Sequence, residues 1–291
     1  MTIPFDYRAP ATLAEALALL RDHGEEAKPL AGGQSLVPLL TLRLARPAVL
    51  VDLHRLDELR AVRREGDALF VGALVRHRAL ERGDGVLADC PLLQEAAALI
   101  GNVRVRTLGT IGGSLAHADP AAEWPAVARA LDALVLVRGP AGDRGVPAGD
   151  FFVGALVTAL RPGELIVGVR LPVLGPGTGY AVEEFSRRAG DFAVVAAVAV
   201  VELAPDGTVA RARVSLAGVG SIPQRLTETE AALAGRRPDP ETLRRAAAHA
   251  GAIEPEGDAH ASAAYRRHLA RVLTARALAR AAAVAARRGA A

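Results

Sequence analysis

The chain has 291 residues, more than one compact core commonly holds, so two or three subdomains are expected. Hydrophobic residues make up 51% and charged residues 23%, as in ordinary globular proteins. The net charge is only +3 and the arginines are dispersed, which argues against a nucleic-acid-binding face. The single cysteine, Cys90, excludes an internal disulfide and an all-cysteine metal or iron–sulfur site within the chain.

Neither export nor membrane insertion is predicted. Residues 1–10 lack a charged segment followed by an apolar one, which is the pattern of a signal peptide. The longest apolar run, 193–201, is far shorter than the roughly 20 residues that span a bilayer. One cysteine is compatible with a reducing compartment, and we expect a cytoplasmic protein.

Helices and short strands alternate through the first 140 residues. Thr12 predicts the N-cap of a helix over 13–23, because leucines follow it at helical spacing. The glycine-rich stretch 101–119 is predicted to be irregular. The other predicted elements are a strand over 28–31, a short helix over 35–40, a strand over 49–53, a hairpin of 62–64 and 68–72, helices over 91–100 and 121–131, and a strand over 133–137. This alternation indicates an α+β or mixed α/β architecture.

The second half of the chain has a different pattern. A strand over 165–171 precedes the proline- and glycine-rich segment 172–179, which is typical of a domain boundary. Three strands and then three helices follow, over 180–186, 193–203, 209–216, 227–234, 240–250 and 262–287. The C-terminal part is therefore predicted to be a β3-and-helices domain.

Two glycine loops are the most informative segments, Lys28–Leu36 and Gly109–Leu115. Each places two adjacent glycines before a small hydroxyl residue, Ser35 or Ser114. Adjacent glycines permit positive φ and a close approach to a ligand, and consecutive N–H groups can converge on an anion. A helix that begins at Ser35 would add the favourable field of its N-terminus. Two such loops could hold a pyrophosphate from opposite sides; the alternative is a pair of ordinary turns, because spacing alone does not name the ligand.

Other nucleotide-binding and catalytic patterns are absent from the sequence. The only lysine, Lys28, precedes the glycines, which excludes a Walker loop. The glycines of 175–179 flank a proline between domains, which argues against a Rossmann fingerprint. The histidines lack metal-ligand spacing, and no nucleophile elbow is present. We interpret Cys90 as buried and the C-terminal arginines as a solvated face, with subunit docking as the alternative; no catalytic or metal-binding residue is predicted.

Five segments in order resemble the FAD-binding medium subunit of molybdenum hydroxylases, the aerobic carbon monoxide dehydrogenase and xanthine dehydrogenase family. They are Ala31–Ser35, Thr110–Ser114 with its continuation His117–Pro125, Phe151–Gly154, Pro162–Ile166 and Glu184–Phe192. The resemblance covers nearly the whole chain. It implies an α+β fold: a PCMH-type, vanillyl-alcohol-oxidase-like FAD-binding domain of two α/β subdomains, 1–55 and 56–174, and a C-terminal domain over 175–291.

The function implied by the resemblance is that of an oxidoreductase subunit that transfers electrons. Its non-covalently bound FAD would take electrons from the [2Fe-2S] clusters of a small partner subunit and pass them to an external acceptor. A large partner subunit would carry the molybdenum cofactor, in a dimer of heterotrimers. A self-sufficient FAD-dependent oxidoreductase and a non-enzymatic nucleotide-binding module are the alternatives. Neither the substrate of the complex nor the acceptor follows from this chain.

The resemblance also implies cofactor-binding residues. Lys28 matches a flavin-proximal position, Ile100 should pack near the isoalloxazine, and Ile166 should touch the adenine or flavin edge. Glu123 stands where an aspartate commonly bonds the ribityl chain, and Phe192 is a candidate gate over one flavin face; surface and core roles are the alternatives for Lys28 and Phe192. The full expected set is Lys28, Pro29, Leu30, Ala31, Gly32, Gly33, Gln34, Ser35, Leu36, Ile100, Gly109, Thr110, Ile111, Gly112, Gly113, Ser114, Ala116, Glu123, Ile166 and Phe192.

Overall fold

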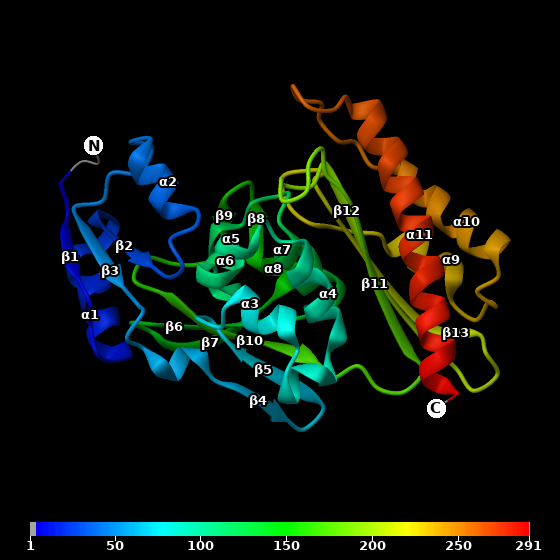
Figure 1. The fold of residues 1–291 in the computed structure, drawn as a ribbon, viewed down its shortest axis with the longest axis horizontal. Coiled ribbons are helices and arrows are strands. Elements are labelled where there is room, and N and C mark those ends of the chain that lie inside the picture. Colours follow the sequence, from blue (N-terminus) through cyan, green and yellow to red (C-terminus); the bar gives the residue numbers. More distant parts are fainter. Residues whose placement is uncertain (1–3, 291) are drawn as a thin grey trace.

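The computed structural model describes residues 4–290 and arranges three main sheets in sequence order along the long axis of the molecule (Figure 1). A parallel sheet lies at the N-terminal end, an antiparallel five-stranded sheet in the middle, and an antiparallel four-stranded sheet at the C-terminal end. The mixed α/β architecture predicted from the sequence is confirmed.

The N-terminal sheet is small and parallel, with the strand order β1-β3-β2. Thr12 caps the first helix, because its Oγ1 accepts the Glu15 N–H at 3.2 Å, as the sequence predicts. The apolar side of this helix packs Leu13 and Leu20 into one core with the central strand. The elements are β1 (Asp6–Arg8), α1 (Leu13–His23), β2 (Ala27–Leu30), α2 (Leu36–Thr41) and β3 (Val49–Asp52). The loop between β2 and α2 is the first glycine loop.

The middle sheet has the strand order β4-β5-β10-β6-β7, and helices cover one of its faces (Figure 1). Alternate residues of β5 and β6, such as Leu69, Val71 and Val135, are buried with Trp124 in the largest core. The strands are β4 (Val62–Glu65), β5 (Ala68–Gly72), β6 (Leu134–Gly139), β7 (Gly142–Pro147) and β10 (Leu165–Pro172), with a separate pair β8 (Phe152–Gly154) and β9 (Val157–Thr158). The helices are α3 (His77–Arg82), α4 (Pro91–Leu99), α5 (Val103–Leu108), α6 (Ile111–His117), α7 (Glu123–Ala130) and α8 (Ala148–Phe151).

The prediction that 101–119 is irregular is wrong, because this stretch folds into α5 and α6. Two capping side chains decide the outcome. Asn102 Oδ1 accepts the N–H groups of Arg104 and Val105, and Thr110 Oγ1 accepts that of Gly113. Capping of this kind stabilises a helix by about 1 kcal/mol, comparable with the cost of one interior glycine. Other elements that the sequence did not predict are β1, α3, β7, α8, β8, β9 and, in the C-terminal part, β14 (Gln224–Arg225).

The C-terminal domain is an antiparallel meander, β11-β12-β13-β14, crossed by a long helix. Its elements are β11 (Thr178–Phe185), β12 (Val195–Leu203), β13 (Val209–Ala217), β14 (Gln224–Arg225), α9 (Thr227–Leu233), α10 (Pro240–Ala248) and α11 (Ala263–Gly289). Residues of β12 alternate between the core of the middle sheet and the core under α11, which explains the continuous apolar run 193–201. None of the helices within residues 4–290 is both long and apolar enough to cross a membrane.

The arginines of α11 do not form one solvated face. Arg266 is buried, and its guanidinium donates to the carbonyl oxygens of Val194 and Gly218 and to Asp258. Arg280 joins α11 to the middle domain through Glu95 of α4. These two arginines therefore connect separate parts of the chain, contrary to the expectation, whereas Arg271 and Arg276 are exposed as expected.

Candidate functional site

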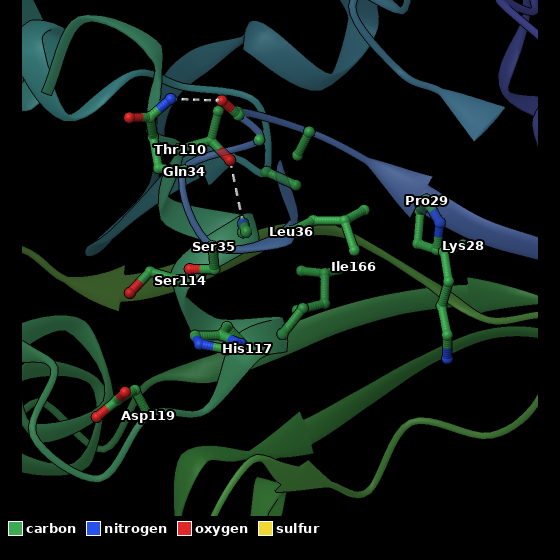
Figure 2. Close-up of a pocket in the computed structure, with 18 of the residues that line it drawn as sticks. Lys28, Pro29, Gln34, Ser35, Leu36, Thr110, Ser114, His117, Asp119 and Ile166 are labelled. Atoms are coloured by element: carbon green, nitrogen blue, oxygen red, sulfur yellow. Dashed lines mark hydrogen bonds between the residues drawn. The ribbon is translucent and has the colours of Figure 1, made fainter. Parts of the chain in front are cut away.

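A cavity of about 890 Å³ lies where the two glycine loops meet. The first loop reaches it from the N-terminal sheet, and the second loop and β10 reach it from the middle domain. A third contribution comes from the C-terminal domain, through Gly190, Asp191 and Phe192. Figure 2 shows Lys28 extending into this space and Asp119 at the opposite side. The site is therefore assembled from all three sheets.

The first loop presents free backbone donors. From Gly32 to Leu36 no backbone N–H has an acceptor among the described residues. Gly33 adopts a left-handed φ of 72°, which a residue with a Cβ rarely takes. The Gln34 side chain donates to the Gly32 carbonyl oxygen at 3.1 Å and braces the turn (Figure 2). Consecutive free N–H groups of this kind are able to bind an anion, and here they lead into α2.

The second loop is different, because it forms the first turn of α6 and the N–H groups of Ile111 and of both its adjacent glycines are already bonded. Ile111 and Gly112 donate to the carbonyl oxygens of Val75 and Ala73, at 3.1 and 2.9 Å. Gly113 donates to Thr110 Oγ1 at 3.1 Å (Figure 2). The expectation of two equivalent N–H nests is therefore wrong for this loop, which lines the cavity with the side chain of Ser114 and with glycine Cα atoms.

Close backbone packing explains the glycines that do not have positive φ. A Cβ on Gly32 would lie 2.3 Å from the Leu108 carbonyl oxygen and 2.7 Å from the Gly109 Cα. A Cβ on Gly112 would lie 2.5 Å from the Ala73 Cβ and 2.7 Å from the Ala73 carbonyl oxygen. The first loop thus packs on the second, and the second packs on the residues that follow β5. These two glycines set the distance between the walls of the cavity.

The cavity is acidic beside α7. Glu123 begins this helix and is only 5% exposed; burial, the largest effect, and the neighbouring Asp119 together raise its pKa to about 7. Glu184 of β11 does not line the cavity but interacts electrostatically with Glu123; it is half-buried, and its buried Oε2 has no hydrogen-bond partner within residues 4–290. Burial, together with the charge of Glu123, raises its pKa to about 8. Both side chains therefore hold protons readily near neutral pH.

His77 is a cavity residue that the sequence analysis did not select. It begins α3 and is 4% exposed, and burial, followed by the charges of Arg76 and Arg106, lowers its pKa to about 4. Trp124 Nε1–H donates to His77 Nδ1 at 3.0 Å. The available signal was its position at the start of a helix after a buried strand, but α3 itself was not predicted.

Most of the expected site residues surround this one cavity. Leu30 and Ile111 do not line it; the Ile111 side chain is 2% exposed and packs in the large core. Phe192 is 59% exposed, which contradicts its interpretation as a core residue, and Lys28 is also exposed. Lining residues that were not expected include Leu53, Ala73, Leu74, His77, Gly101, His117, Asp119, Leu156, Arg161, Glu164, Gly190 and Asp191. Within residues 4–290 no cluster of three or more metal-ligating side chains occurs.

Cys90 is fully buried, as predicted, at the N-terminus of α4. Burial raises the pKa of its thiol to about 12, so the thiolate does not form near neutral pH.

Comparison with known proteins identifies two family models in the chain. The FAD binding domain in molybdopterin dehydrogenase matches residues 3–174, and the CO dehydrogenase flavoprotein C-terminal domain matches residues 180–281. The interval between the two models coincides with the proline- and glycine-rich segment before β11.

Curated relatives match over nearly their full lengths. The chain is 43% identical to the 6-hydroxypseudooxynicotine dehydrogenase complex subunit alpha of Paenarthrobacter nicotinovorans, over 95% of this chain and 94% of that protein. It is 40% identical to the carbon monoxide dehydrogenase medium chain of Afipia carboxidovorans, over 95% and 96%.

Solved structures agree with these relatives. The carbon monoxide dehydrogenase from Hydrogenophaga pseudoflava superposes with a TM-score of 0.94 at 40% identity, covering 97% of this chain and 99% of that chain. Quinoline 2-oxidoreductase from Pseudomonas putida gives a TM-score of 0.93 at 37% identity, covering 98% and 99%. The chain therefore belongs to the family of FAD-binding medium subunits of molybdenum hydroxylase-type dehydrogenases, and FAD is its cofactor.

Proposed function

We propose that this chain is the electron-relay subunit of a molybdenum hydroxylase complex. It would take electrons from the iron–sulfur clusters of a small partner subunit and pass them to an external acceptor. The observation that carries this proposal is the full-length match to proteins named as a subunit or medium chain of dehydrogenases, on a chain that has one cysteine. An iron–sulfur cluster commonly needs four thiolates, so the clusters must belong to another chain.

The residues of the cavity fit FAD. The unbonded N–H groups from Gly32 to Leu36 are suited to phosphate oxygens, and a cavity of about 890 Å³ is large enough for a dinucleotide-sized ligand. We assign the pyrophosphate to the first loop, with Thr110 and Ser114 supplying hydroxyl groups from the other side. When bound, FAD supplies reversible one- and two-electron redox chemistry.

Side chains at the ends of the cavity would orient the rest of the cofactor. We assign Glu123 to a ribityl hydroxyl, because this side chain lines the cavity and, protonated in part near neutral pH, can donate or accept a hydrogen bond. Ile100 and Ile166 provide apolar walls, and Lys28 supplies a positive charge. The exposed ring of Phe192, on a segment of the C-terminal domain, is suited to cover the flavin and limit its contact with water.

We propose that the complete assembly contains a small [2Fe-2S] subunit and a large molybdenum subunit, as a dimer of heterotrimers in the cytoplasm. Within this chain, units over 1–55, 56–174 and 175–291 each carry one main sheet, which supports the division made from the sequence. The large subunit would bind the substrate and hydroxylate it.

An anaerobic titration of the purified chain tests the relay. Dithionite should bleach the flavin absorption of the isolated chain, whereas candidate hydroxylase substrates should leave it unchanged. Adding both partner subunits should make substrate bleach the same band. Rapid bleaching of the isolated chain by a substrate would instead show a self-sufficient oxidoreductase, and acid precipitation should release the flavin into the supernatant because no covalent link is proposed.

A further inference from the structure

A buried histidine–tryptophan pair lies directly beneath the second glycine loop. The His77 backbone N–H donates to the Gly109 carbonyl oxygen at 3.0 Å, and its ring packs against the same residue. A Cβ on Gly109 would lie 2.6 Å from His77 Cδ2 and 2.7 Å from Nε2. From α7, Trp124 donates its indole N–H to His77 Nδ1 at 3.0 Å. The imidazole is therefore fixed in position by two helices and the loop.

The partner of Nδ1 determines where the imidazole proton resides. An indole nitrogen can only donate, so His77 Nδ1 must be the unprotonated acceptor. In a neutral imidazole the remaining proton is then on Nε2. Burial and the nearby Arg76 and Arg106 favour the neutral form, since they lower the pKa of His77 to about 4. Near neutral pH, His77 is thus an uncharged donor with a fixed tautomer.

The Nε2–H group has no acceptor among the described residues, although His77 lines the cavity and is only 4% exposed. Nε2 is not among the fully buried side-chain atoms of residues 4–290 that lack a partner, so this donor is accessible from the cavity. In the adjoining loop the N–H groups of Ile111, Gly112 and Gly113 are already bonded, so this side of the cavity offers fewer backbone donors than the first loop does. An acceptor oxygen supplied by a ligand in the cavity would satisfy this donor.

We propose that His77 is a cofactor-positioning residue that donates a hydrogen bond from Nε2–H to a phosphate oxygen of FAD, and that Trp124 holds the imidazole in the tautomer that can do so. In this arrangement His77 donates to the phosphate from the side of the second loop, as the free backbone N–H groups would from the side of the first loop. The inference rests on FAD as the cofactor and not on the proposed route of the electrons.

Nitrogen-15 spectra of the histidine side chains test the tautomer and its ligand in the full-length chain. In the FAD-free chain at pH 7, His77 should show a protonated Nε2 and an unprotonated Nδ1. ADP, which shares the pyrophosphate of FAD, should shift the Nε2–H signal, and riboflavin, which has no phosphate, should not. A proton on Nδ1, or an Nε2–H signal that neither ADP nor FAD moves, would overturn the proposal.

Two amide variants separate ligand binding from structural support. His77→Gln keeps an N–H near the Nε2 position, and His77→Asn keeps an acceptor near Nδ1 for Trp124 but has no donor toward the cavity. We expect the Kd for FAD to rise about tenfold in His77→Asn and to stay within about threefold of the parent in His77→Gln. Equal affinity in both variants, or losses that follow only the melting temperature of the FAD-free chain, would show a structural role.

Trp124→Phe provides a third arm that leaves His77 in place. Without the indole donor, Nδ1 should become protonated in part of the molecules, and FAD affinity should fall less than in His77→Asn. An unchanged tautomer would contradict the role of Trp124. Because these measurements follow binding alone, a complex that binds FAD as expected but fails to relay electrons would overturn the proposed function and not this inference.

Discussion

The two glycine loops have the same local composition but use it in different ways. The loop after β2 leaves its N–H groups from Gly32 to Leu36 without acceptors among the described residues. In the loop that forms the first turn of α6, three consecutive N–H groups, from Ile111 to Gly113, are bonded to Val75, Ala73 and Thr110. The difference comes from the neighbours. The chain after β5 runs beside the second loop and its carbonyl oxygens accept the N–H groups there, whereas the Leu108 carbonyl oxygen that lies against Gly32 accepts no N–H group of the first loop. A glycine pair therefore indicates close approach without saying whether a ligand or another backbone approaches.

The largest effect is expected where the two loops touch. Gly32→Ala places a Cβ 2.3 Å from the Leu108 carbonyl oxygen, and neither backbone can yield easily. We expect the free energy of unfolding of the FAD-free chain to fall by about 2–3 kcal/mol and bound FAD to be lost. Denaturant unfolding and flavin content measure the two effects. Gly175→Ala, which meets nothing within 4 Å, is the matched control, and equal results for the two would refute the packing argument.

The left-handed turn in the first loop predicts a smaller loss. Gly33→Ala should lower the free energy of unfolding by about 1–2 kcal/mol, because φ is 72° at this position. It should also weaken FAD binding, because it disturbs the turn that directs the free N–H groups. Gly207→Ala imposes similar strain at φ 80° in the β12–β13 turn, far along the chain from the cavity. Flavin fluorescence titration should show weaker binding for Gly33→Ala alone. If both variants bind FAD equally well, the first loop does not bind the pyrophosphate.

Capping should distinguish the hydroxyl residues of the two loops. Thr110→Val removes the acceptor of the Gly113 N–H and should lower stability by about 1 kcal/mol, while Thr110→Ser should retain most of it. Ser35 makes no side-chain capping bond, so Ser35→Ala should stay within about 0.5 kcal/mol in the FAD-free chain. Thermal unfolding of the FAD-free variants measures the loss of stability at each position. Equal losses in Thr110→Val and Ser35→Ala would contradict the capping role of Thr110.

The half-buried carboxyl of Glu184, whose pKa is raised in part by Glu123, predicts a modest dependence of stability on pH. The pKa of Glu184 is about 8 in the folded chain and 4.5 ordinarily, so between these values the folded chain holds a proton that the unfolded chain has released. Stability should therefore fall as pH rises through this window. Glu184→Gln should reduce this fall in the free energy of unfolding by about 1 kcal/mol or less, since solvent partly screens the side chain. Melting temperatures from pH 5 to 9 provide the test; parallel curves for parent and variant would contradict it.

Much of the scaffold follows from local sequence signals. The cap at Thr12, the helix of 13–23 and the meander of β11 to β13 are encoded by spacing and turn residues, which act over a few positions. The two helices within 101–119 could not be predicted in this way. Glycines lower helix propensity, and Asn102 and Thr110 act as caps only when the turn that follows them forms.

The sequence by itself determined the family and singled out the two glycine loops, which line one cavity, because both depend on ordered motifs. Only the tertiary structure decided which loop has free N–H groups, that Arg266 is buried, and that His77 and Trp124 meet across 47 positions. Each of these depends on a partner distant in the chain. Hydrogen-bond satisfaction and burial are properties of the assembled neighbourhood, and no window of local sequence contains them.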